Sequence, residues 1–73
     1  MTDPLVDEEP IMQFFFFTHL PSQLQAVSAP FSDMARNIIA TLPRNPERTV
    51  ALRKLLEAKD AAVRARLYKD TPA

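Results

Sequence analysis

The sequence predicts an all-α protein, an antiparallel two-helix hairpin that follows a short aromatic segment and assembles into a symmetric homo-oligomer. Apolar residues recur at helical spacing over residues 22–42 and again over residues 46–67, and a proline-rich turn at residues 43–46 separates the two stretches. Two helices alone cannot enclose a core, and the 73-residue chain has no cysteine to form a disulfide. We therefore expect the helices to bury their apolar faces against copies of the same chain.

The first ten residues hold four acidic side chains and two prolines, a composition that predicts a disordered lead-in. The folded domain is expected over residues 11–68, with a flexible tail at residues 69–73. Near its start lie four consecutive phenylalanines, Phe14 to Phe17. This run fits neither a helical nor a strand period, and fully exposed it would promote aggregation. We expect it to be covered on both sides, most simply by another subunit.

The first long helix is predicted to begin at Ser22, which forms an S-x-x-Q capping box with Gln25. Pro30 removes one backbone hydrogen bond, so we expect one helix over residues 22–42 that is kinked at this position. Its apolar stripe continues through the proline. The stripe consists of Leu24, Val27, Phe31, Ala35, Ile38 and Leu42.

The second helix is predicted over residues 46–67, with Asn45 as its N-cap and Pro46 at the first helical position. Its apolar residues form a heptad seam that is rich in alanine, which lets helix axes approach closely. The seam consists of Ala51, Leu55, Ala58, Ala62 and Ala65, widened by Leu52, Leu56 and Val63.

The charge balance bears on the partners of this protein. Nine basic and nine acidic residues cancel, whereas proteins that bind many phosphates of DNA or RNA usually carry a positive surplus. A small anion needs only two or three placed cations and is not excluded. The longest apolar run, residues 11–17, is too short to span a bilayer, and acidic residues precede it, unlike in a signal peptide. We expect a cytosolic protein without a membrane or a nucleic-acid polymer as partner.

No catalytic or metal-binding constellation is visible in the sequence, and we expect neither enzymatic activity nor a cofactor. The chain does place aromatic side chains near cations. Phe17 and His19 are candidates for stacking on a base, and Arg36 and Lys59 are candidates for binding phosphate. Each has a simpler interpretation. The phenylalanines also suit an oligomer core, His19 suits a helix cap, and the basic residues suit a solvated face.

Two segments resemble a known family. Residues 17–21 (FTHLP) and 23–31 (QLQAVSAPF) resemble the F/Y-x-H-L-P and H-L-Q-x-x-S-x-P-F pattern of a phage protein family. Residues 42–65 (LPRNPERTVALRKLLEAKDAAVRA) are similar to the helical-hairpin domain of that family. The family includes phage sponges that sequester immune signalling nucleotides. One branch blocks the cyclic-oligonucleotide system CBASS, and another blocks the cyclic-ADP-ribose system Thoeris.

The resemblance implies a compact helical homo-oligomer, a hexamer in the CBASS-blocking branch, that binds nucleotides between subunits without cleaving them. In that branch a tyrosine before the H-P step stacks on the base, and Phe17 is at the matching position. The phosphate-binding lysine of the branch has no basic counterpart here, since Ser28 or Pro30 falls near its position. An arginine at the centre of the family's oligomer corresponds to Arg64, which joins Arg36 and Lys59 as a phosphate-binding candidate.

The leading hypothesis is therefore a phage anti-defence protein that sequesters cyclic di- or trinucleotides in the cytoplasm of the infected bacterial host. One alternative is a sponge for cyclic ADP-ribose isomers. Another is a helical oligomerisation or adaptor module with no small ligand, which would give no thermal shift with any nucleotide. The sequence does not identify the nucleotide, the number of sites or the subunit count.

Overall fold

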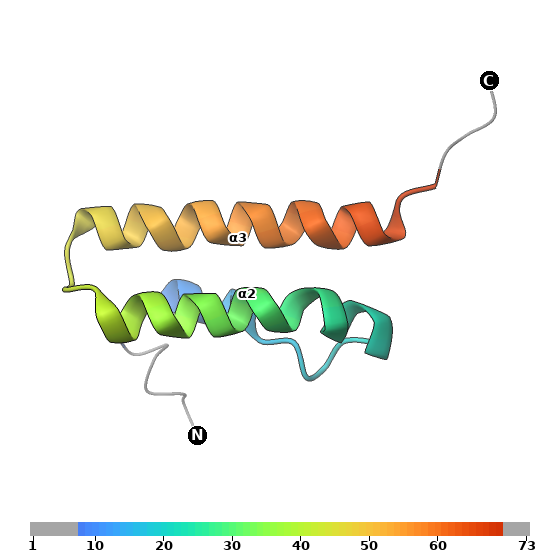
Figure 1. Cartoon of the computed structure of the whole chain (residues 1–73), viewed down its shortest axis with the longest axis horizontal. Coiled ribbons are helices and arrows are strands. Elements are labelled where there is room, and N and C mark those ends of the chain that lie inside the picture. Colours follow the sequence, from blue (N-terminus) through green and yellow to red (C-terminus); the bar gives the residue numbers. More distant parts are fainter. Residues whose placement is uncertain (1–7, 70–73) are drawn as a thin grey trace.

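The computed structural model describes residues 8–69, which form three helical elements and no strand (Figure 1). A 3₁₀ helix, η1 (Pro10–Phe15), precedes two long helices, α2 (Ser22–Thr41) and α3 (Pro46–Leu67). The two long helices pack side by side in antiparallel orientation, joined by a short turn. The predicted all-α hairpin is confirmed for this part of the chain, with the end of α2 one residue earlier than expected. None of the helices within residues 8–69 is long and apolar enough to cross a bilayer.

The start of α3 is fixed by local sequence, as predicted. Asn45 is extended, and its Oδ1 atom accepts a hydrogen bond of 2.9 Å from the backbone N–H of Arg48. Pro46 occupies the first helical position, where its missing N–H leaves no hydrogen bond unmade. Glu47 lies in the first turn, near the positive end of the helix dipole. These contacts involve residues within three positions of one another, which is why the sequence alone located this boundary.

The predicted capping box at the start of α2 is wrong. Pro21 holds the cap position with non-helical backbone angles, so Ser22 is already the first helical residue and its side chain comes one position too late. The side chain of Gln25 instead donates to the carbonyl oxygens of Leu20 (2.7 Å) and Thr18 (3.3 Å). The glutamine therefore ties the preceding loop to the helix. Farther along, α2 continues through Pro30 as one helix.

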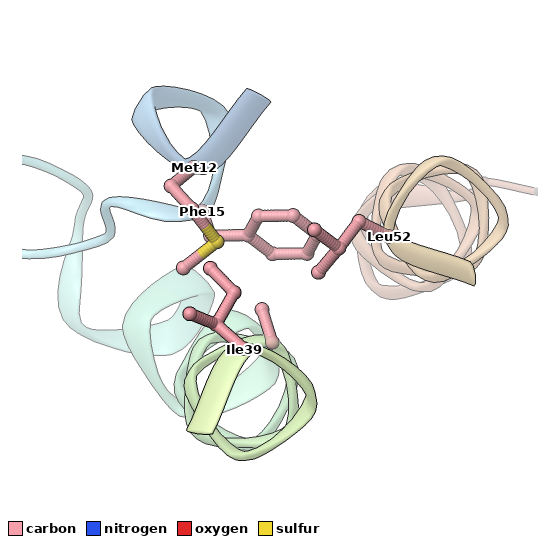
Figure 2. Close-up of a cluster of buried hydrophobic side chains, with 5 residues drawn as sticks. Met12, Phe15, Ile39 and Leu52 are labelled. Carbon is pink, nitrogen blue, oxygen red and sulfur yellow. The ribbon is translucent and has the colours of Figure 1, made fainter. Parts of the chain in front are cut away.

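The chain builds its own core, which corrects the expectation that the hairpin needs another subunit to enclose one. Met12 and Phe15 of η1 insert between the long helices and meet Ile39 of α2 and Leu52 of α3, beside Ala35 (Figure 2). A 3₁₀ helix has three residues per turn, so Met12 and Phe15 lie on the same side of η1. Of the four phenylalanines, Phe15 is thus buried within its own chain, whereas Phe14 remains 56% exposed.

The innermost rows of both helices differ from the predicted stripes. The buried row of α2 is Ser28, Ser32, Ala35 and Ile39, displaced to one side of the predicted apolar stripe, with which it shares only Ala35. In α3 the buried residues are Arg48 and Leu52. Leu52 belongs to the predicted widened seam, whereas Ala58 and Ala65 of that seam are exposed. The reason is η1: its apolar residues cover one side of the hairpin and draw inward the rows nearest to it.

The acidic lead-in also differs from expectation where the structure describes it. Glu8, Glu9 and Pro10 are placed, and Glu9 is buried, because its carboxylate pairs with Arg48 of α3. Residues 1–7 of the predicted lead-in and residues 70–73 of the predicted tail lie outside the described residues.

Candidate functional site

A pocket of about 280 Å³ lies between the loop after η1 and α2. Phe16, Phe17 and Thr18 line it from the loop, and Ser32 and Arg36 line it from α2. The lining therefore combines two aromatic rings, two hydroxyl groups and one guanidinium. Ligand pockets commonly have volumes of roughly 300–1,000 Å³, so this pocket is slightly smaller than that range.

Local structure positions the loop side of the pocket. The backbone becomes extended at Phe16, where η1 ends, and then turns back, with the N–H of Leu20 donating to the carbonyl of Phe17 at 3.0 Å. The two bonds from Gln25 hold this turn against the first turn of α2. On the helix side, Ser32 and Arg36 are four residues apart and so lie one above the other on the same face.

The structure brings together two of the five predicted contact residues. Phe17 and Arg36 both line the pocket. His19 is exposed in the turn and is not part of the lining. Lys59 is mostly buried on α3, with its side chain 16% exposed and its Nζ atom 3.0 Å from Oδ1 of Asp60. Arg64 is exposed near the end of α3. Neither Lys59 nor Arg64 lines the pocket.

Sequence reasoning missed Ser32 and Thr18, and it named Phe16 only as part of the phenylalanine run. For Ser32 a signal was present, because it precedes Arg36 by one helical turn. Thr18 had no such signal, since its place depends on how the loop folds back on α2. The pocket so formed brings together residue types that can stack on a planar base and bind a phosphate.

Arg48 forms the strongest polar cluster among the described residues, and it is structural. Its side chain is only 2% exposed, and its Nη2 atom lies 3.0 Å from a carboxylate oxygen of both Glu8 and Glu9. Its Nη1 atom donates to the carbonyl of Leu42 at 3.1 Å and, at a longer 3.5 Å, to that of Ile39. The guanidinium thus satisfies carbonyl oxygens that the end of α2 leaves without a helical partner.

The two glutamates favour the charged form of this buried guanidinium. Burial by itself lowers the pKa of Arg48, but hydrogen bonds and charge attraction from Glu9 and then Glu8 outweigh burial, and the pKa is raised above its ordinary value. The donors of Arg48 are directed at two carboxylates and two carbonyls, and Arg48 does not line the pocket. The described residues also hold no group of three or more histidine, cysteine or carboxylate side chains suited to a metal ion.

Neither a family model, nor a curated protein, nor a solved structure matches the chain. The resemblance of residues 17–31 and 42–65 to the phage sponge family therefore depends on the quoted residues alone.

Proposed function

We propose that this protein binds a cyclic oligonucleotide immune messenger and sequesters it without cleavage, with Phe17 and Arg36 in direct contact with the ligand. The observation that supports the proposal is the pocket itself, in which an aromatic ring and a guanidinium, both selected from sequence, line one hollow. A stacked base and a charge-assisted bond to phosphate are the two interactions by which such a messenger is held.

The size of the pocket bears on how the ligand is held. At about 280 Å³ the pocket suits one base with its phosphate rather than a whole cyclic di- or trinucleotide. The rest of the ligand then extends beyond the pocket. The proposal keeps the homo-oligomer, a hexamer by resemblance. The proposed place of action is the cytoplasm of an infected bacterial host, where sequestration silences CBASS-type signalling.

A thermal-shift panel with cyclic dinucleotides, cyclic trinucleotides and cyclic ADP-ribose isomers tests the proposal. A ligand that binds only the folded state stabilises it by about 2.7 kcal/mol at 100 times its dissociation constant. We expect a shift with at least one cyclic oligonucleotide, and intact ligand released on heating. A shift with cyclic ADP-ribose isomers alone would assign the Thoeris-type alternative. No shift with any nucleotide would contradict the proposal and favour the adaptor alternative.

Phe17→Ala tests the site. Removing the ring removes a stacking contact worth roughly 1–3 kcal/mol per base, which corresponds to a 5- to 150-fold weaker affinity. Phe14→Ala is the matched control, because Phe14 is exposed and does not line the pocket. Titration calorimetry with the nucleotide found in the panel measures both variants. Equal affinities for Phe17→Ala and the unmodified chain would place the ligand elsewhere.

A further inference from the structure

The two faces of the hairpin are covered unequally. Figure 2 shows η1 on one side of the pair formed by α2 and α3, where Met12 and Phe15 enter the core. The loop that follows stays on this side of α2, since it lines the pocket with Ser32 and Arg36. Among the described residues, no element covers the opposite side of the hairpin.

The uncovered side of α2 carries a heptad row of large apolar residues. At about 100° per residue, steps of three and four keep this row in one line. The row flanks the buried row on the side away from the pocket. The inner edges of Phe31 and Ile38 pack against the core, but Met34 is 50% exposed. The row consists of Leu24, Val27, Phe31, Met34 and Ile38.

No charge interrupts this row. The charged residues of α2 are Asp33 and Arg36, and both project away from it. Four members of the row are partly buried and Met34 is half exposed. A continuous, partly exposed apolar row without a charge is typical of an interaction site.

The matching row of α3 is the heptad seam predicted from sequence, which is displaced from the buried row of that helix. On each helix the apolar row is rotated from the buried row in the same sense along the sequence. Because α2 and α3 are antiparallel, this rotation brings both apolar rows to the same face of the hairpin. Leu55 packs on the core, and Ala58 is exposed. The α3 row is mostly small where the α2 row is large, so the two are complementary in shape. Its members are Ala51, Leu55, Ala58, Ala62 and Ala65.

The face is large enough for a stable interface. Helices of 20 and 22 residues are about 30 Å long, and two packed helices are about 20 Å wide. The face therefore measures on the order of 600 Å², comparable with the roughly 800 Å² that each partner contributes to a standard interface.

We propose that this helical face, and not the phenylalanine segment, binds a second copy of the chain. The large row of α2 in each copy packs on the alanine-rich row of α3 in the other. The contact is two-fold symmetric and self-complementary, and it closes into a four-helix bundle with an η1 on each outer side. The inference depends on the proposed homo-oligomer, whose interface it names, and not on the nucleotide.

Charge substitutions on the full chain test the interface without any nucleotide. Met34→Glu places a carboxylate in the middle of the apolar row, and Ala58→Glu does the same on α3. Phe14→Glu is the matched control, because it adds the same charge at a similarly exposed apolar residue of η1. Sedimentation velocity measures the mass of each variant, and circular dichroism confirms that its helices are retained.

We expect the unmodified chain and Phe14→Glu to sediment as dimers or larger assemblies, and Met34→Glu and Ala58→Glu to sediment as folded monomers. A monomeric unmodified chain would overturn the inference. So would a Phe14→Glu variant that dissociates as readily as the face variants, or face variants that both remain assembled. A dimer that gives no thermal shift with nucleotides would refute the proposed function and leave this interface intact.

Discussion

At the scale of single residues, Arg48 shows how far a side chain can depart from what its type suggests. In sequence it is one of several arginines on an amphipathic helix, equally suited to phosphate or to solvent. In the structure it is buried and paired with Glu9. This partner lies 39 positions earlier in the chain, so the local sequence around Arg48 does not reveal the pair. Its raised pKa has a simple consequence for pH dependence. The stability contributed by the charged guanidinium is fully present below the ordinary pKa of arginine and is lost only above it.

Arg48→Lys is expected to destabilise the protein although it keeps the charge. An ammonium lacks the planar fork that reaches two carboxylates and two carbonyls at once, so several buried acceptors are left without a donor. Chemical denaturation measures the loss, and the exposed Arg53→Lys of the same helix is the control. The structural role of Arg48 would be refuted by equal unfolding free energies for the two variants.

The cap at Asn45 has a smaller and purely local effect. Asn45→Ala removes the bond to the N–H of Arg48 and is expected to lower the unfolding free energy by about 1 kcal/mol. Asn45→Asp keeps an acceptor at this position and should retain most of that stability. Thermal unfolding of the three proteins checks the order, and an unchanged Asn45→Ala variant would show that the bond contributes nothing.

At the scale of elements, η1 does most to set the shape of this small protein. It is only six residues long, but it supplies Met12 and Phe15 to a core that the long helices do not close. It also decides which row of each helix becomes buried, and its end places Phe16 and Phe17 over α2 to form the pocket. Of the four phenylalanines, Phe15 therefore joins the core, Phe16 and Phe17 line the pocket, and Phe14 is exposed.

Phe15→Ala is expected to cost about 3–5 kcal/mol, since it leaves a cavity where the ring meets Leu52 and Ile39. Phe14→Ala, one residue earlier and exposed, should change the stability by less than about 0.5 kcal/mol. Urea denaturation of both variants separates a core residue from its neighbour. If Phe15→Ala were as stable as Phe14→Ala, η1 would not be part of the core.

At the scale of the whole molecule, an intrachain core and an uncovered apolar face coexist. The sequence predicted assembly because two helices cannot enclose a core. In the structure, η1 completes a core within one chain. Assembly stays a prediction, now supported by the partly exposed heptad rows rather than by a missing core. Interface formation should stabilise the folded state by mass action.

The midpoint of thermal unfolding is therefore expected to rise with protein concentration for the unmodified chain. Met34→Glu should unfold at a midpoint that does not depend on concentration, because its face no longer binds a second copy. Differential scanning calorimetry over a dilution series checks both statements. A constant midpoint for the unmodified chain would mean that its stability comes from one chain alone.

The sequence by itself determined the helix class, the bounds of the two long helices and the cap at Asn45. These follow from hydrophobic periodicity and from contacts between residues a few positions apart. It also selected Phe17 and Arg36, by residue type and by resemblance, without showing that they meet. Only the tertiary structure decided the buried rows, the Glu9–Arg48 pair, the missing capping box and the separation of Lys59 and Arg64 from the pocket. A helical period identifies a broad apolar stripe, but the row that becomes innermost depends on what packs against it. Here that element is η1, whose Met12 and Phe15 pack with Leu52 of α3, a residue far along the chain.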